Sequence, residues 1–253
     1  MRMYAVITGA SGGLGQAFSR QLAARGYDLI LSARRTDALE GLRRDLSSRV
    51  TVRIFPTDLS SQEGRVSLAR FCAAQEVGVL INNAGFGLLG PSSGQPPERE
   101  RELIAVNAEA VQFLTKAIAA SMSGGYILNV ASLAGFQPAP GFAAYGATKA
   151  YILQWSRAVS YEWRREKRSV SLSVLCPGPV STGFDRAAGA VRSRGGMEPD
   201  KCVAIGLRGL FHGKPLIVPG LAMKGAHLAS RLLPTRILLP IQYRIQRQKL
   251  RPL

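Results

Sequence analysis

The segment YGATK carries two side chains suited to proton transfer. In a helix, residues four apart lie on one face, so Tyr145 and Lys149 would stand side by side. A free tyrosine has a pKa of about 10, too high for ready proton exchange at neutral pH, and a neighbouring ammonium group lowers that pKa. Tyr145 would then give a proton to a carbonyl oxygen or take one from an alcohol.

Ser132, in the segment NVASLAG, follows a predicted strand. Ligands of an open α/β sheet bind beyond the carboxyl ends of its strands, so the Ser132 hydroxyl would hold a substrate oxygen beside Tyr145. Serine is also common in turns and at helix caps, which is the alternative. A lone Tyr-x-x-x-Lys pair arises often by chance, so the assignment depends on the other strand ends.

Four glycines lie close together in the N-terminal segment YAVITGASGGLGQAF. A helix that follows such a loop binds phosphate at its N-terminus, because free N–H groups and the helix dipole favour an anion. We expect Gly9 to permit the tight turn, Gly13 to admit a pyrophosphate and Gly15 to let the helix pack on the strand. The spacing differs from the common G-x-G-x-x-G fingerprint, and a flexible loop is the alternative.

The second predicted strand ends in LSARR, where an NAD site usually has an acidic residue. Ala33 stands there instead, and Arg34 and Arg35 follow. A guanidinium group at this place pairs with a 2′-phosphate, which predicts NADP(H) as the cofactor. The alternative for the arginines is a solvated charge at a helix start, and Asp37 is expected to begin that helix.

Further motifs follow other strands, and together they carry a resemblance. INNAG ends the fourth predicted strand, with Asn83 available to a cofactor, and PGPVST follows the sixth. The ordered set TGASGGLG, NNAG, Asn107, Ser132, YGATK and PGPVST resembles the short-chain dehydrogenase/reductase family over residues 4 to about 220. Any one motif is weak evidence, but six in order are strong.

The resemblance implies a role for each catalytic residue. Tyr145 would be the acid/base, and Lys149 would lower its pKa. Ser132 would hold the substrate oxygen, and Asn107 would sit in a helix distortion that holds a proton-relay water.

It also implies a cofactor site, in which Asp58 contacts adenine, with a helix N-cap as the alternative for Asp58. Val180 and Thr182 would hold the nicotinamide carboxamide. The implied cofactor-binding residues are Gly9, Ser11, Gly13, Leu14, Gly15, Arg34, Arg35, Asp58, Leu59, Asn83, Ala84, Gly85, Tyr145, Lys149, Pro177, Gly178, Val180 and Thr182.

These residues need a scaffold of buried strands joined by helices. Short, non-alternating apolar runs are typical of strands buried on both faces of a parallel sheet. The predicted strands are Tyr4–Thr8, Leu29–Ser32, Thr51–Phe55, Val79–Asn82, Tyr126–Val130, Ser171–Leu175 and Leu216–Val218. The predicted helices are Leu14–Arg25, Asp37–Leu46, Arg99–Ser121 and Ala143–Arg165. This alternation predicts a Rossmann-type, doubly wound, seven-stranded parallel sheet flanked by helices.

The composition is that of an ordinary globular protein with one core. The chain has 253 residues and is 46% apolar, so we expect one catalytic domain over residues 1–220 and an extension over residues 221–253. Three scattered cysteines have no metal-ligand spacing and are typical of reduced thiols, so no metal site is predicted. The sequence shows no secretory signal and no apolar run of roughly 18 residues, which predicts a cytoplasmic protein.

Positive charge gathers in the extension. The net charge is +17, and residues 201–253 hold ten basic and no acidic side chains. Leu228, Leu232 and Leu233 form one helical stripe. Pro240 predicts a second helix start, after which Ile241 and Ile245 continue an apolar face among Arg244, Arg247 and Lys249.

This basic amphipathic segment has two interpretations. It packs on the core, the substrate mouth or a second subunit, or it lies on an anionic membrane surface as a peripheral anchor at the inner face. It is similar to the tails of reductases related to long-chain ketoacyl and steroid reductases, which would imply an apolar ketone as substrate.

The predicted activity is NADP(H)-dependent reduction of a ketone or oxidation of a secondary alcohol, with a small-molecule substrate. One alternative is a regulatory protein that binds NADP(H) without catalysis, and another is a membrane-associated scaffold that uses the basic tail. The family resemblance implies a homodimer or homotetramer. No nucleic-acid partner is predicted, because the sequence has no recognised module or interleaved aromatic residues.

Overall fold

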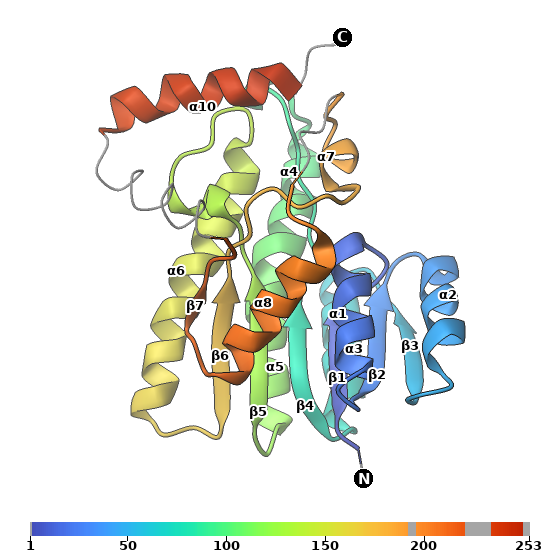
Figure 1. Cartoon of the computed structure of the whole chain (residues 1–253). Coiled ribbons are helices and arrows are strands. Elements are labelled where there is room, and N and C mark those ends of the chain that lie inside the picture. The colour runs from blue at the N-terminus through green and yellow to red at the C-terminus, as the bar shows by residue number, and fades with distance from the viewer. Residues whose placement is uncertain (1, 192–195, 221–233, 250–253) are drawn as a thin grey trace.

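The protein is described by a computed structural model for residues 2–191, 196–220 and 234–249. Seven strands form one all-parallel sheet in the order β3-β2-β1-β4-β5-β6-β7 (Figure 1). They are β1 (Tyr4–Thr8), β2 (Asp28–Ala33), β3 (Val52–Pro56), β4 (Val77–Asn82), β5 (Gly125–Val130), β6 (Val170–Leu175) and β7 (Leu216–Ile217). The strand order reverses between β1 and β4, which is where such a sheet binds its ligands.

The seven predicted strands are confirmed, with ends within two residues of those expected. Every residue of β1 and β4 is buried, because helices cover both faces of the sheet. The runs of Val, Ile and Leu therefore have apolar neighbours on either side. The predicted doubly wound α/β fold is the observed one.

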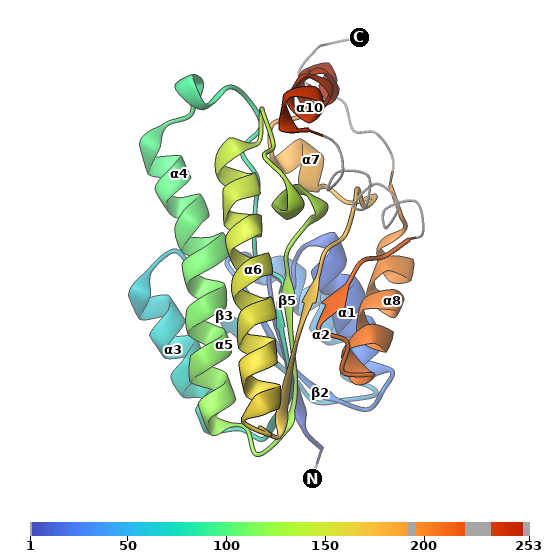
Figure 2. The same cartoon turned by 90° about the vertical axis from the view of Figure 1, so that its left-hand side faces the viewer.

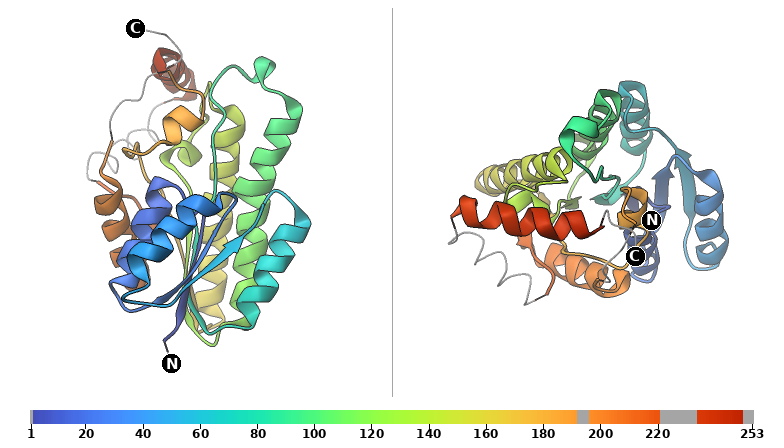
Figure 3. Two further views of the ribbon diagram at one scale, coloured as in Figure 1. Left: turned by 90° about the vertical axis from the view of Figure 1, so that its right-hand side faces the viewer. Right: turned by 90° about the horizontal axis from the view of Figure 1, so that it is seen from above.

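Helices form a layer on each face of the sheet. Helices α1, α2 and α8 cover one face, and α3, α5 and α6 cover the other (Figure 2 and Figure 3, left). The longer helices are α1 (Gly13–Ala23), α2 (Thr36–Leu46), α3 (Gln62–Ala73), α4 (Pro97–Ile104), α5 (Ala110–Ser121), α6 (Ala143–Arg165) and α8 (Pro199–Phe211). The short helix α7 (Phe184–Ala187) follows β6.

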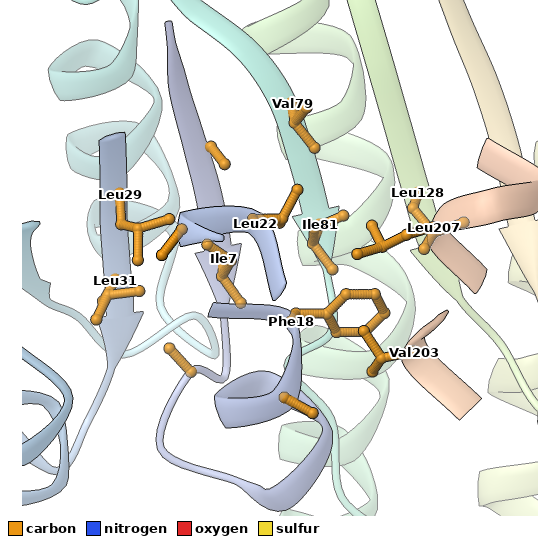
Figure 4. Packing of buried hydrophobic residues seen from close by; sticks show 14 of the residues in the cluster. Ile7, Phe18, Leu22, Leu29, Leu31, Val79, Ile81, Leu128, Val203 and Leu207 are labelled. Carbon is orange, nitrogen blue, oxygen red and sulfur yellow. The ribbon is translucent and has the colours of Figure 1, made fainter. Parts of the chain in front are cut away.

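An apolar core between α1, α8 and the sheet holds the helix that follows the glycine loop in place. Phe18 and Leu22 on α1 pack against Ile7, Ile81 and the α8 side chains (Figure 4). Phe18 and Leu22 are fully buried. Burying a large apolar side chain contributes roughly 1.5–3 kcal/mol, so this packing holds the start of α1 firmly against the end of β1.

Among the described α-helices, α3, α7 and α8 were not named in the sequence analysis, and one predicted helix is interrupted. The stretch predicted as one helix over Arg99–Ser121 is α4, a π-helical turn η2 (Ala105–Glu109) and α5. Taken together, Pro97–Ser121 is long and apolar enough to cross a membrane by length and composition, a test that core helices of soluble proteins also pass. Half of its most apolar window is buried inside the protein.

The C-terminal helix α10 (Thr235–Lys249) lies across the end of the molecule where the strands finish (Figure 1 and Figure 3, right). Its start corrects the prediction, because Pro240 lies inside the helix instead of in its first turn. The carbonyl of Pro234 accepts hydrogen bonds from the amides of Ile237 and Leu238, so helical bonding is established one turn earlier. The predicted stripe of Leu228, Leu232 and Leu233 lies outside the described residues.

Candidate active site

The glycine loop joins β1 to α1 and leaves the start of the helix open. Gly9 has a φ of +64°, and a Cβ on Gly15 would lie 2.2 Å from the Gly9 carbonyl oxygen, so both positions require glycine as expected. The N-cap Gly12 offers no side-chain acceptor to the first turn. The first N–H groups of α1 therefore face outward with the positive end of the helix dipole.

The Asn83 side chain is hydrogen-bonded to the start of the glycine loop. Its Nδ2 donates to the carbonyls of Thr8 at 3.0 Å and Gly9 at 3.1 Å. The Thr8 hydroxyl accepts hydrogen bonds from the amides of Asn83 and Ala84, both at 3.1 Å. The ends of β1 and β4 are thus tied together at the switch point. Thr8 is a functional residue that the sequence analysis missed, although it stands inside the TGASGGLG motif.

The loop PGPVST closes over the other side of the glycines. A Cβ on Gly13 would lie 2.8 Å from Thr182 Cγ2, so these two predicted cofactor residues are neighbours. Val180 forms a bridge with Met197, and the Pro177 carbonyl accepts from the Leu133 amide at 3.0 Å.

Four further predicted cofactor residues differ in burial. Ser11, Leu14 and Gly178 are half-buried, and Leu59 is buried. Gly85 lies beside Asn107 and Lys149, because a Cβ there would be 2.9 Å from Asn107 Oδ1 and 3.4 Å from Lys149 Nζ.

Charged side chains gather at the end of β2. Arg34 and Arg35 are exposed, and Arg34 pairs with Glu102 at 2.9 Å. Asp37 lies in the first turn of α2, and no side chain caps that helix.

Asp58 stands close to this corner. Burial acts most strongly on its pKa and in the upward direction, but hydrogen bonds from Ser60 and the charge of Arg34 together hold the pKa of Asp58 below its ordinary value. The alternative role for Asp58 is wrong, because Ser61 is the N-cap of α3.

Tyr145 and Ser132 meet beyond the carboxyl ends of β5 and β6. Ser132 acts on the Tyr145 phenol as a hydrogen-bonding neighbour that lowers its pKa, and the Ser132 hydroxyl accepts from the Ala134 amide at 3.2 Å. The Tyr145 ring lies between Phe142 and Phe184, with centroids 5.2 and 5.4 Å away. The phenol is therefore held in one orientation by an aromatic pair and a hydroxyl.

Lys149 and Asn107 complete this group. Lys149 Nζ donates to the Val130 carbonyl at 2.9 Å and lies 5.7 Å from the Tyr145 ring centroid. Asn107 is fully buried in the π-turn η2, which confirms the expected helix distortion. Its Oδ1 accepts from the Phe86 amide at 3.0 Å, and its Nδ2 donates to the Phe86 carbonyl at 2.9 Å and the Thr148 hydroxyl at 3.3 Å.

Burial governs the protonation of this group. It raises the pKa of Tyr145 to about 12, although the Ser132 hydrogen bond acts in the opposite direction. Burial lowers the pKa of Lys149 to about 8. The expected lowering of the tyrosine pKa by Lys149 is therefore not seen in this structure, because desolvation of the phenol outweighs it.

Apolar side chains and α10 surround the outer side of Tyr145. Tyr145 belongs to a buried group with Leu89, Phe142 and Ala188, and Phe184 packs against it. Lys249, at the end of α10, pairs with Asp185 at 3.1 Å, and its Nζ lies 5.7 Å from the Phe142 ring centroid.

These contacts place the end of α10 beside Phe142, whose ring packs against Tyr145. The carbonyl of Lys249 also accepts a hydrogen bond from the Val191 amide at 2.9 Å. The C-terminal helix is thus fixed to the segment after β6 by both side-chain and backbone contacts.

Comparison with known proteins decides the family. The sequence model for the short chain dehydrogenase family matches residues 3–192. The chain belongs to this family. In this short-chain dehydrogenase, the match covers the glycine loop and the group around Tyr145, so the predicted resemblance is confirmed.

Two curated relatives illustrate the branch. The human 17-beta-hydroxysteroid dehydrogenase type 3 is 31% identical over 193 residues, which are 74% of this chain and 62% of that protein. The very-long-chain 3-oxoacyl-CoA reductase of Neurospora crassa is 34% identical over 181 residues, which are 68% of this chain and 54% of that protein. The chain thus spans between about half and two thirds of the length of these relatives, and the expected similarity to ketoacyl and steroid reductases is confirmed.

A solved short-chain dehydrogenase from Sphingobium yanoikuyae in complex with NADPH has the same fold. It is 30% identical, with a TM-score of 0.81, and the alignment covers 90% of this chain and 95% of that one. Chains of this fold have been solved with NADPH and with NAD. The fold therefore supports a nicotinamide cofactor of either kind.

Proposed function

We propose that this short-chain dehydrogenase is an NADP(H)-dependent carbonyl reductase or alcohol dehydrogenase. The carrying observation is the group around Tyr145 at the edge of the sheet where the glycine loop opens: Tyr145, Lys149 and Asn107 are buried there, and the half-buried Ser132 acts on the Tyr145 phenol to lower its pKa. A protein that only senses a nucleotide has no need of this proton-transfer group. The reaction class follows from the group, and the cofactor preference follows from Arg34.

The residues present fit a dinucleotide. The uncapped start of α1 offers N–H groups to a pyrophosphate, and only glycine fits at Gly9 and Gly15. Arg34 and Arg35 would hold a 2′-phosphate, and Asp58 would contact the adenine end. Lys149, with Val180 and Thr182, would hold the nicotinamide end. When bound, the cofactor supplies or accepts the hydride.

The chain's own residues handle the oxygen and its proton. Ser132 holds the substrate oxygen by a hydrogen bond. Tyr145 gives its phenolic proton to that oxygen during reduction and takes a proton from it during oxidation. With a pKa of about 12, the phenol is protonated at neutral pH, which suits the reducing direction. Asn107 and Lys149 would help to return a proton to Tyr145 after it has given its own to the substrate oxygen.

The surroundings of Tyr145 favour an apolar ketone. Leu89, Phe142 and Phe184 face the reactive phenol, and α10 covers the outer side. The relatives named as steroid dehydrogenase and 3-oxoacyl-CoA reductase act on large apolar carbonyl compounds by name, and we extend that substrate class to this chain.

Consumption of NADPH and NADH against a panel of ketones tests this function. We expect turnover of a long-chain or polycyclic ketone with NADPH, and weak turnover of short polar aldehydes. A chain that binds NADPH but reduces no member of the panel would instead be the regulatory protein or the scaffold.

We also propose that α10 rests on an anionic membrane surface. Ile237, Ile241 and Ile245 are 46%, 47% and 39% exposed on its outer face, beside Arg244 and two further arginines. Exposed isoleucines in a basic helix with no acidic residue are typical of interfacial helices. The apolar substrate class is consistent with this location.

Sedimentation with anionic vesicles at low salt tests the membrane proposal. The intact chain should sediment with them, and the double variant Arg244→Glu with Arg247→Glu should not. Lys201→Glu, an exposed change on α8, is the matched control and should leave binding unchanged. Equal recovery of the intact chain with and without vesicles would refute the proposal.

We propose further that the chain forms a homodimer or homotetramer through its long helices. Tyr151 and Tyr161 on α6 and Ile104 on α4 are exposed apolar side chains on these helices. Light scattering of the purified protein measures the assembly directly, and a monomer would contradict the proposal.

A further inference from the structure

Arg65 is a buried arginine that joins two separate parts of the candidate site. It lies in α3 and is 5% exposed. Its Nη1 donates to the carbonyls of Leu59 at 3.1 Å and Ser60 at 3.0 Å. Its Nη2 donates to Glu109 Oε1 at 2.5 Å. A buried guanidinium group is costly unless it is paired, so these contacts fix its position.

The first of these parts is the loop after β3. Asp58 Oδ1 accepts from the Ser60 amide at 2.9 Å and hydroxyl at 2.8 Å, and the Asp58 carbonyl accepts from Ser61 at 3.0 Å. A Cβ on Gly64 would lie 2.1 Å from the Asp58 carbonyl oxygen, so the loop is pressed against the start of α3. Arg65 holds the same loop from its buried side.

The second part is the π-turn. Glu109 is the last residue of η2, and Asn107 stands two positions before it. A π-turn widens the helix by one residue and costs regular hydrogen bonding, so it needs support from outside the helix. The ion pair from Arg65 provides that support through Glu109, while Asn107 contacts Phe86 and Thr148.

We infer that Arg65 is a positioning residue that keeps the adenine-side loop and the π-turn of Asn107 in one fixed relation. The inference rests on the proposed function and names a residue outside its catalytic group. Asn107 contacts Thr148, whose hydroxyl donates to the Tyr145 carbonyl at 2.8 Å. The contacts therefore run without a gap from the loop of Asp58 to the helix of Tyr145.

Two variants distinguish the contact of Arg65 with the Asp58 loop from its contact with the π-turn. Arg65→Met should weaken NADPH binding about tenfold and lower kcat about tenfold, because both parts lose their support. Glu109→Gln keeps Arg65 on the loop but loses the charged partner, so kcat should fall while NADPH binding stays within about twofold of wild type. Arg70→Met, an exposed change on the same helix, is the control and should change neither.

NADPH binding is measured by the quenching of protein fluorescence, without turnover. The inference is therefore tested even where the ketone panel shows no activity. If folded Arg65→Met keeps wild-type NADPH affinity and kcat, the role is only structural and the inference fails. If Arg65→Met does not fold, Glu109→Gln decides, because that side chain is more than half exposed. Unchanged kcat in that variant would then overturn the inference.

Discussion

Desolvation sets the charge of the two titrating side chains in the site. Tyr145 and Lys149 are both buried, and burial moves their pKa values toward the neutral form of each, to about 12 and about 8. The spacing of the pair in the sequence indicates contact on one helix face. It carries no information on burial, which depends on Phe142, Phe184 and the strand ends, and so the direction of the tyrosine pKa could not be predicted from it.

The Lys149 pKa predicts a pH profile. The ammonium form is present below about pH 8 and is lost above it, so kcat/KM for NADPH should fall as pH rises from 7 to 10. Tyr145 adds no second limb, because it stays protonated over this range. Lys149→Met should have a much lower and flat profile. A wild-type profile that is flat to pH 10 would show that the charge of Lys149 is not required.

Arg34 predicts the cofactor preference. Arg34→Ala should lower kcat/KM for NADPH about tenfold or more and leave that for NADH nearly unchanged, because a charged hydrogen bond contributes roughly 1.5–3 kcal/mol. The measurement is the ratio of the two constants in wild type and variant. Arg43→Ala, an exposed change on α2, is the control. An unchanged ratio in Arg34→Ala would remove the basis for NADP(H).

At the scale of elements, the regular helices and strands were predictable from the residue pattern, whereas the helix distortion at Asn107 was expected only from the family resemblance. The span of α6 was predicted to the residue, and its buried positions recur at helical spacing along the whole helix. The pattern alone predicts one continuous helix through Ala105–Glu109, and the bounds of the π-turn come from the structure. The residue pattern predicted that the C-terminal helix begins at Pro240. It begins earlier because the Pro234 carbonyl accepts the first helical hydrogen bonds.

The ion pair between Lys249 and Asp185 predicts the behaviour of α10. Both side chains are mostly buried, so Lys249→Met should cost about 1 kcal/mol of local stability and speed amide exchange over Thr235–Lys249 about fivefold. Hydrogen–deuterium exchange with mass spectrometry measures this. Lys214→Met, an exposed change before β7, should leave α10 unaffected. Equal exchange in all three proteins would show that the pair does not hold the helix.

At the scale of the molecule, sheet and site are consequences of one arrangement. The parallel order brings the ends of β1, β4, β5 and β6 to one edge, and the separate motifs at those ends meet there. Sequence motifs in fixed order therefore predict both the fold and the site. The basic extension carries no such ordered motifs. The position of its helix α10 is shown only by the structure, through the contacts of Lys249 with Asp185 and the Phe142 ring.

The central claim is that Tyr145 moves the proton in a ketone reduction driven by NADPH. The most direct test is Tyr145→Phe, measured for NADPH affinity and for turnover of the best ketone in the panel. We expect affinity close to wild type, since the phenyl ring still fits between Phe142 and Phe184, and turnover reduced by at least about 100-fold. Turnover at the wild-type rate in this variant would contradict the account.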